Sequence, residues 1–321
     1  MKILKFLFTK TAVIVLLFFV QVYLLIASAV FFYDNFFIIQ VVTTVIGHLM
    51  LLYTINKKSN PEVKLPWIIM FLLVPVVGVP VYFMFAEPRV KKKRLKLLKG
   101  IFTETSTYLN RKEKETKQVK NALKDKYGFD EYLSKTSYTT GRLYNKVTYL
   151  NSGEKFFEDL LIELEKATDF IFLEYFVIAR GYMWDKIHEI LVKKSSLGVD
   201  VRVIYDHIGS LGRVKDGFRR QLEKENIKCV KFNPIVPIVS GIYNNRDHRK
   251  ITVIDGKVAY TGGANIGDEY INKKKRFGHW KDSAIKVEGP SVKDFTAMFL
   301  QLFDMEKKSK KRLRKVFNRS N

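Results

Sequence analysis

The sequence predicts an α/β fold, a sheet flanked by helices, preceded by transmembrane helices. Two observations predict this arrangement. Residues 1–88 are dominated by long uncharged apolar runs, and from about Gly141 short apolar strands alternate with amphipathic helical segments. Alternating strand and helix patterns are typical of a sheet covered by helices. An uncharged run of about twenty apolar residues is long enough to cross a bilayer.

Three apolar runs predict a membrane region of two or three helices over residues 1–88. They cover residues 11–33, 35–55 and 65–86. The third run is interrupted by Pro75, Gly78 and Pro80, which predicts a broken or re-entrant helix. For the first run a cleaved signal peptide is an alternative, because lysines precede it and Ala-Ser-Ala at 27–29 resembles a cleavage site.

Lysine and arginine are distributed unevenly along the chain. The formal net charge is +24, which suits either nucleic acid or an anionic membrane, and the apolar runs favour the membrane. Basic residues precede the first run, follow the second and follow the third. This bias places the main body on the cytoplasmic side of a multi-pass membrane protein. Cys229 is the only cysteine, so an internal disulfide is excluded, and its apolar neighbours predict a core residue.

Residues 89–140 are predicted to form a basic linker, and residues 307–321 a basic tail. The stretch 89–99 is dense in lysine and arginine. Such a segment can lie on anionic headgroups, and a solvated charged helix is the alternative. Residues 110–126 mix both charges and hold few large apolar side chains, which predicts an exposed helix or linker.

Residues 141–306 are predicted to form the globular domain. The expected helices are 154–167, 183–196, 214–226 and 291–305. The expected strands are 169–178, 199–206, 227–232, 249–255, 257–263 and 282–289. The first helix is recognised by apolar residues at helical spacing, and the turn Asp255-Gly256 joins two of the strands.

The stretch Asn-Asn-Arg-Asp-His-Arg-Lys-Ile-Thr-Val-Ile-Asp-Gly, residues 244–256, carries a chemical signal. Residues two apart on a strand share a face, so His248 and Lys250 point the same way. An imidazole and an ammonium are poor neighbours unless an anion lies between them. A phosphate suits both, because the lysine neutralises its oxygens and the imidazole can attack phosphorus. With Asp255 the pattern becomes H-x-K-x4-D.

Gly262, Gly263 and Asn265 follow this pattern as G-G-x-N. The glycines would let the backbone approach a phosphate closely, and Asn265 can donate its amide. H-x-K-x4-D alone is a weak motif, but joined to G-G-x-N it predicts a phosphate-transfer site. The histidines are scattered and form no cluster of metal ligands, so neither a metal nor another cofactor is expected.

Residues 244–271 resemble the first HKD motif of the phospholipase D superfamily, and most resemble that of bacterial cardiolipin synthases. The similarity extends to LEYFVI, GVDVRVIYDHIGS, HWKDSAIKVEGPSV and, near the N-terminus, NPEVKLPWIIMFLLVPVVGVPVYFMF. The resemblance implies a phospholipase D-like mixed sheet in which two such motifs meet at a pseudo-two-fold axis. One histidine of the pair becomes phosphohistidine, and the other protonates the leaving group.

The resemblance also implies a role for each candidate residue. His248, Lys250 and Asp255 would form the catalytic motif, with His248 as the nucleophile and Asp255 as a structural member. Lys250 and Asn265, with the two glycines before Asn265, would bind the substrate phosphate. Asp282 would orient the nucleophilic histidine, since a carboxylate fixes an imidazole tautomer and stabilises its charged form.

The implied reaction converts two phosphatidylglycerol molecules into cardiolipin and glycerol. The expected partners are therefore phosphatidylglycerol and other anionic phospholipids in a bacterial cell membrane, and nucleic acid is not expected. A membrane-anchored phospholipase D-type phosphodiesterase or nuclease is the rival enzyme class. A catalytically inactive regulatory protein that binds anionic lipid is a further alternative.

The chain departs from the family in carrying one HKD motif where family enzymes carry two. A homodimer could present two copies of His248, or a separate second half could supply the other motif, or the chain could be a truncated form. His207 stands where the resemblance leads us to expect an acid. Glu174 matches a family position and is expected beside the site or at the edge of the core.

Overall fold

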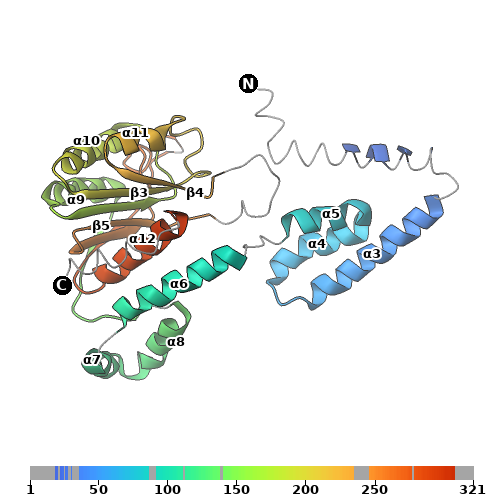
Figure 1. Cartoon of the computed structure of the whole chain (residues 1–321), viewed down its shortest axis with the longest axis horizontal. Helices are drawn as coiled ribbons and strands as arrows, with labels where there is room; N and C mark the ends of the chain where they lie inside the picture. Colours follow the sequence, from blue (N-terminus) through green and yellow to red (C-terminus); the bar gives the residue numbers. More distant parts are fainter. Residues whose placement is uncertain are drawn as a thin grey trace. The chain divides into compact units, whose positions relative to one another are not determined.

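The computed structural model describes residues 19–20, 22–24, 26–27, 30, 36–86, 92–110, 113–137, 140–234, 246–276 and 278–307. These residues fall into two compact units that divide near residue 90. The first unit is helical, and the second contains one seven-stranded sheet with helices on both faces (Figure 1). The predicted basic tail lies outside the described residues, apart from Lys307.

The helical unit contains α3 (Phe36–Asn56), α4 (Pro61–Leu73) and α5 (Pro75–Phe85). α4 begins where the Asn60 side chain accepts a hydrogen bond from the backbone of Glu62. The third apolar run breaks at Val74, because Pro75 cannot continue the helical hydrogen bonds. Gly47 lets α3 and α5 pack closely, since a Cβ there would lie 2.5 Å from the Cβ of Pro75.

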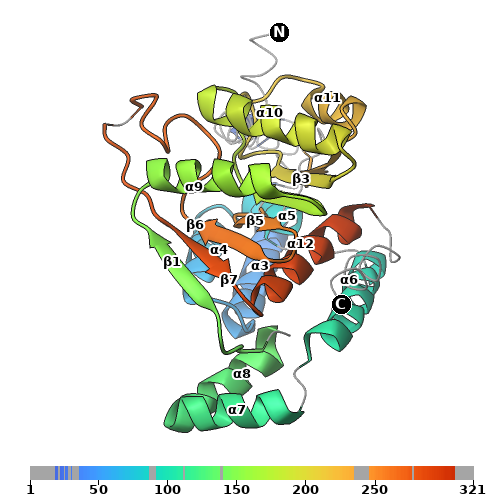
Figure 2. The ribbon, with the colours of Figure 1, turned by 90° about the vertical axis from the view of Figure 1, so that its left-hand side faces the viewer.

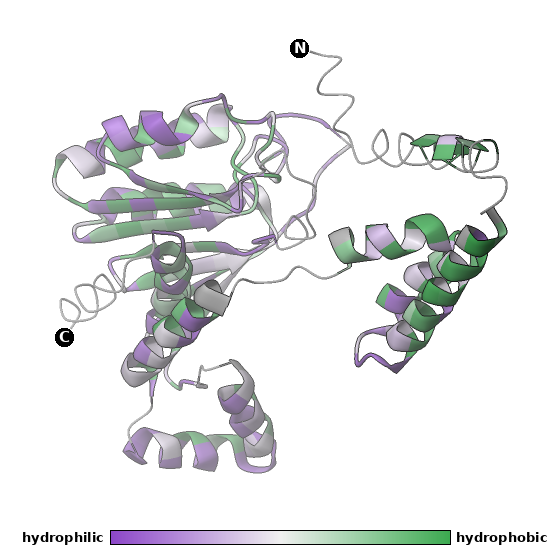
Figure 3. Ribbon diagram, turned by 45° about the vertical axis from the view of Figure 1, so that its right-hand side comes forward, coloured by the Kyte–Doolittle hydropathy of each residue, from purple (hydrophilic) through white to green (hydrophobic). Residues whose placement is uncertain are grey.

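The predicted membrane-spanning helices are not confirmed. The run 11–33 lies largely outside the described residues. Within the described ranges, no helix combines the length and the apolar character needed to cross a membrane. The third run forms two helices of 13 and 11 residues, each shorter than the roughly 20 residues that a bilayer requires. Many large apolar side chains of the helical unit are exposed, and the helices of this unit are coloured mainly as hydrophobic (Figure 3).

The sheet of the second unit is mixed, in agreement with the predicted fold class. Its strands are β1 (Lys146–Leu150), β2 (Phe170–Tyr175), β3 (Asp200–Asp206), β4 (Lys228–Phe232), β5 (Lys250–Ile254), β6 (Val258–Gly262) and β7 (Ala284–Glu288). Their order across the sheet is β1-β7-β6-β5-β2-β3-β4. β2, β3 and β4 are parallel, and the other neighbouring pairs are antiparallel. Cys229 of β4 is a core residue, as predicted, and burial raises the pKa of its thiol to about 12.

Helices cover both faces of the sheet (Figure 2). One face carries α9 (Gly153–Lys166), α10 (Tyr182–Ser196) and α11 (Phe218–Lys224), and the other carries α12 (Val292–Lys307) and α6 (Lys92–Leu109). β2 contributes to both cores, because side chains alternate along a strand. Leu173 and Tyr175 pack on the α9–α11 side, and Phe170 and Phe172 pack on the α12 side.

α6 lies within the range predicted as a basic linker, but it packs on α12 as part of the domain. Ile101 is fully buried and Leu109 is 2% exposed, and both belong to the core on the α12 side. After α6 come α7 (Glu113–Leu123), the short 3-10 helix η2 (Lys124–Lys126) and α8 (Tyr127–Ser137). Part of this range therefore belongs to the folded body.

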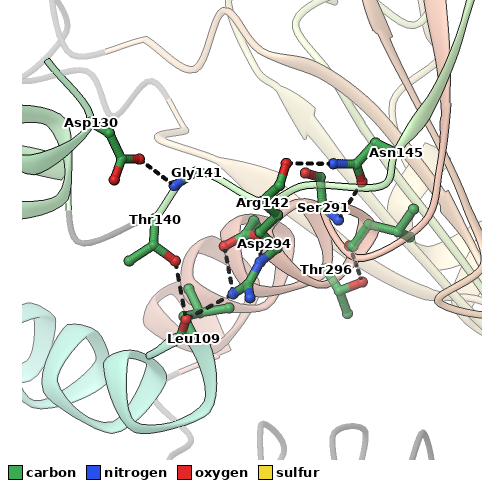
Figure 4. Close-up of polar contacts among 10 residues, drawn as sticks. Leu109, Asp130, Thr140, Gly141, Arg142, Asn145, Ser291, Asp294 and Thr296 are labelled. Carbon is green, nitrogen blue, oxygen red and sulfur yellow. Dashed lines mark hydrogen bonds and ion pairs between the residues drawn. The ribbon is translucent and has the colours of Figure 1, made fainter. Parts of the chain in front are cut away.

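Arg142 joins the end of α6 to α12 (Figure 4). Its Nη2 donates to the Leu109 carbonyl oxygen at 2.8 Å and to Oδ1 of Asp294 at 3.2 Å, while its Nε pairs with Oδ2 of Asp294. Nearby, Asp130 accepts a 2.8 Å hydrogen bond from the backbone of Gly141. Burial raises the pKa of Asp294, although the charge of Arg142 opposes the shift.

Replacing Arg142 by alanine should lower the free energy of unfolding by about 3 kcal/mol, because Asp294 would stay buried without its partner. Thermal unfolding of the purified chain measures the change. Lys146→Ala is the matched control, since Lys146 is 73% exposed in its ion pair with Glu288. Its loss should cost less than about 1 kcal/mol, and equal effects of the two substitutions would contradict the role given to Arg142.

Candidate functional site

One edge of the sheet collects most of the residues that the sequence predicted. β5 runs antiparallel to β2, with Lys250 paired to Tyr175. The start of β5 therefore lies at the carboxyl end of β2, beside the carboxyl ends of the parallel strands β3 and β4. The end of β6 and the start of β7 meet at the same edge, where Gly262 pairs with Ala284. The carboxyl ends of parallel strands are a common place for ligands in α/β sheets.

His248 and Lys250 lie together at this edge. The His248 side chain is exposed, and its ring centroid lies 4.8 Å from that of Phe176. Lys250 is 6% exposed, and its Nζ donates to the backbone oxygen of His248 at 2.7 Å. Burial lowers the pKa of Lys250, while Asp247 and Asp282 oppose the shift. An exposed imidazole thus lies beside a desolvated ammonium, an arrangement that suits an anionic ligand.

Gly262 and Gly263 make room for the start of β7. A Cβ on Gly262 would lie 2.4 Å from the backbone oxygen of Ser283, and one on Gly263 would lie 2.2 Å from Oδ1 of Asp282. The sequence predicted that these glycines let the backbone approach a phosphate. In the structure Gly262 lets the backbone of Ser283 approach, and Gly263 lets the Asp282 carboxylate approach. Their role toward a phosphate stays a prediction.

Asp282 is held by its own neighbours. Its Oδ2 accepts a hydrogen bond from Nε1 of Trp280 at 3.2 Å, and its Oδ1 accepts one from the backbone of Ser283 at 2.8 Å. Its charge acts on Lys250, whose pKa it raises against the effect of burial. Among the described residues no hydrogen bond joins Asp282 to His248, so its histidine-orienting role stays a prediction.

Asn265 is buried and links two segments at the edge. It is 4% exposed, its Oδ1 accepts a 3.0 Å hydrogen bond from the backbone of Val177, and its Nδ2 donates to the Tyr270 hydroxyl at 2.9 Å. An amide nitrogen carries two donors, so one further bond to a ligand is open to it. Asn265 therefore fixes the loop after β6 against the residues that follow β2.

Asp255 lies at the opposite end of β5 from Lys250. Its carboxylate accepts hydrogen bonds of 2.8 Å from the backbones of Thr168, Asp169 and Phe170, and one of 3.0 Å from the Thr168 hydroxyl. Burial raises the pKa of Asp255, these hydrogen bonds lower it, and the net shift is downward. Asp255 thus anchors β5 to the start of β2, and the structure does not bring it to the edge that holds Lys250.

Comparison with known proteins connects this site to a family. Residues 160–302 match the family model described as cardiolipin synthase, PLD-like domain. Residues 160–302 are a PLD-like domain. Residues 46–86 match a second model, described as phospholipase D-nuclease N-terminal. The resemblance drawn from the sequence is thereby confirmed.

Curated relatives match much of the chain. A Streptococcus mutans protein described as uncharacterized is 39% identical over 80% of this chain and 56% of its own length. Cardiolipin synthases of Alkalihalophilus pseudofirmus and Bacillus anthracis are 30% and 29% identical over 80% of this chain and 53% and 50% of theirs. The chain therefore spans about half the length of these relatives. The crystal structure of Nuc from Salmonella typhimurium, a phospholipase D family member, aligns with a TM-score of 0.38 and 17% identity over 50% of this chain and 96% of that one.

Glu174, expected beside the site or at the edge of the core, is fully buried, and the sequence did not reveal its contact with Arg249 next to His248. Nε of Arg249 lies 2.5 Å from Oε1 of Glu174 and 3.3 Å from Oδ1 of Asp247. Burial raises the pKa of Glu174 well above its usual range, Arg249 opposes the shift, and Asp247 reinforces it. Strand parity could have found this cluster, because Arg249 shares a strand face with Ile251, which pairs with Glu174.

Gly263→Ala should lower the free energy of unfolding by about 1–3 kcal/mol, because the added Cβ would overlap the Asp282 carboxylate. Thermal unfolding measures the loss. Gly128→Ala in α8 is the matched control, since no atom lies within 4 Å of a Cβ there and alanine favours a helix. Adding Asp282→Ala to Gly263→Ala should restore part of the stability. No recovery in that double variant would contradict the clash.

Asp255 should make stability depend on pH in the acid range. Its folded pKa lies below the unfolded value of about 3.9. The carboxylate therefore stabilises the fold at pH values above the unfolded pKa. Its contribution to stability is lost as the pH falls through the folded pKa. We expect Asp255→Asn to melt below the wild type at neutral pH, with the difference shrinking in acid. A difference in melting temperature that stays constant across this range would contradict the anchor.

Proposed function

We propose that this chain supplies one half of the active site of a cardiolipin synthase-type phosphatidyltransferase. One observation carries the proposal: exposed His248 lies next to buried Lys250. The Lys250 Nζ donates a 2.7 Å hydrogen bond to the backbone oxygen of His248. The ammonium would meet the charge of a phosphodiester bound there, and the imidazole would face its phosphorus. The match to the family model and the cardiolipin synthase relatives support phospholipid as the substrate.

The proposed reaction begins when a nitrogen of His248 attacks the phosphorus of one phosphatidylglycerol. A P–N bond forms, the P–O bond to the headgroup glycerol breaks, and the leaving oxygen takes a proton from an acid to give glycerol. A headgroup hydroxyl of a second phosphatidylglycerol then attacks the phosphohistidine. A P–O bond forms, the P–N bond breaks, and the hydroxyl proton returns to the group that acted as the acid. Cardiolipin leaves, and the imidazole is regenerated.

Three further residues support this step in the proposal. Lys250 neutralises a phosphate oxygen. The negative charge of the phosphate would raise the pKa of Lys250 and so offset the lowering by burial. Asn265 donates its second amide N–H to the phosphate, and its first remains with Tyr270. Asp282 orients the imidazole once substrate is bound, because catalytic hydrogen bonds often tighten only in the complex.

The acid for the leaving group has to come from a second HKD motif. The chain carries one such motif and spans about half the length of its cardiolipin synthase relatives. In the proposal, a second copy of the chain or a separate second half supplies the other histidine. A two-fold arrangement would place two copies of His248 face to face across one phosphate.

An anionic bacterial membrane is the proposed location. Large apolar side chains on α3, such as Phe37 at 76% exposed, and on α4, such as Leu73 at 75% exposed, suit contact with lipid. The net charge of +24 suits anionic headgroups. Lipid thus accounts for both the apolar surface and the charge of the chain.

Expression in bacteria that lack cardiolipin tests the proposal. Cells that make the chain, alone or with a second HKD half, should accumulate cardiolipin in a lipid extract. His248→Ala should reduce the product by at least about 100-fold, because the nucleophile is lost. His279→Ala is the matched control, since His279 is also exposed and also begins an H-x-K sequence.

Each result of this experiment bears on the proposal. Cardiolipin from the chain alone supports a pair of identical chains, and cardiolipin only on co-expression supports a separate half. Equal product from His248→Ala and the wild type would contradict His248 as the nucleophile. No cardiolipin in either arrangement would contradict the proposed reaction.

A further inference from the structure

A basic cavity lies at the carboxyl ends of β3 and β4, along the edge that holds His248. Its volume is about 480 Å³, and its walls come from the end of β3, the following loop, the start of α11 and Lys231 of β4. A cavity of this size falls in the range that binds small molecules and headgroups. The proposed reaction at His248 does not use it.

Basic residues outnumber acidic ones in the lining of this cavity. The basic residues that line it are His207, Lys215, Arg219, Arg220 and Lys231, and the one acidic residue is Asp216. Arg219 pairs with Glu223 at 3.0 Å. In the part of the chain that the structure describes, no carboxylate forms an ion pair with Lys215, Arg220 or Lys231. Several cations around a concave surface create a positive potential that attracts anions.

His207 lies in this positive field. It is one of the residues that line the cavity. Its backbone N–H donates to the Phe232 oxygen at 3.1 Å. Burial lowers the pKa of His207, and the charges of Lys231 and Arg246 lower it further. A bound anion would relieve the repulsion that these charges impose.

The cavity is tied to His248 through packed residues. Ser210, which lines the cavity, donates to the Phe176 backbone oxygen at 3.4 Å. The Phe176 ring packs against His248, with 4.8 Å between ring centroids. Asp206, at the end of β3, accepts a 3.2 Å hydrogen bond from the backbone of Asp247. An anion in the cavity would therefore be bound beside the His248 site without sharing its side chains.

We propose that the cavity formed by His207, Lys215, Arg220 and Lys231 is a second phosphate-binding site, separate from the pair of His248 and Lys250. Its ligand is a phosphate group, carried either by the headgroup of an anionic phospholipid or by free phosphate. Lysine and arginine recognise both through charge-assisted hydrogen bonds. Binding there requires no chemistry at His248.

Anion binding by the purified chain in a zwitterionic detergent tests this site. Calorimetry is run with inorganic phosphate and with glycerophosphoglycerol, the deacylated form of phosphatidylglycerol. A His248→Ala/Lys250→Gln protein should still bind one equivalent of anion. Adding Lys215→Gln and Lys231→Gln should weaken that binding by at least about tenfold, because two charge-assisted contacts are lost.

A control with equal loss of charge makes the test specific. Lys186→Gln with Lys193→Gln removes two exposed lysines of α10, 50% and 59% exposed, and should leave the affinity within about twofold. Arg220 is exposed, so Arg220→Gln should weaken anion binding without lowering the melting temperature. This separates loss of the site from loss of folding.

The calorimetry results identify the ligand and decide whether the second site exists. Tighter binding of glycerophosphoglycerol than of phosphate assigns the site to a lipid headgroup, and equal binding assigns it to free phosphate. Either result, with the losses expected above, supports the second site. Binding by the Lys215→Gln/Lys231→Gln protein equal to that of the α10 control would overturn it. So would the absence of any bound anion once His248 and Lys250 are replaced.

Discussion

The site depends on one interaction at the far end of the strand that carries it. Asp255 accepts three backbone hydrogen bonds of 2.8 Å from residues 168–170, and so fixes β5 against the start of β2. In the resulting register Lys250 pairs with Tyr175. A slip by one residue would turn Lys250 to the face covered by α12, because strand side chains alternate. The turn that joins β5 to β6 also helps to set this register. Asp255 there has a φ of +51°, and a glycine follows it.

The two faces of this strand perform different tasks. Arg249 and Ile251 face the α12 side, where Arg249 lies against the buried Glu174. Lys250 faces the other side, next to Phe176 and the backbone oxygen of His248. The contact of half-buried Arg249 with buried Glu174 thus holds the segment from one face, while the other face presents an imidazole and an ammonium. The same edge continues to the ends of β3 and β4, where the cavity adds further positive charge.

Local patterns in the sequence predicted most of the sheet. The six expected strands correspond to β2–β7. β1 was missed because it is an edge strand whose side chains are mostly exposed, so its apolar pattern is weak. The helix expected at 214–226 is shorter, since Gly217 adopts a φ of +88° and α11 begins after it. α6 was hidden by its lysines, although Ile101 and Leu109 bury it against the domain.

The candidate site was predictable only where neighbours in sequence are neighbours in space. His248 and Lys250 are two residues apart, so strand geometry alone predicted that they lie together. The contact of Gly263 with Asp282 and that of Arg249 with Glu174 depend on which strands pair. That pairing is set by the whole sheet, and a single sequence does not show it. The packing of Phe176 against His248 was missed for the same reason.

The central claim is that His248 is a nucleophile at a phosphate site, and a substrate that needs no acid tests it most directly. A phosphatidyl ester of p-nitrophenol has a leaving group that departs without protonation, so the reaction does not need the acid of a second motif. The purified chain should release about one equivalent of p-nitrophenol in a burst. Mass spectrometry should then find the phosphatidyl group on the peptide that contains His248. An equal burst from His248→Ala, or an adduct on another residue, would contradict the account.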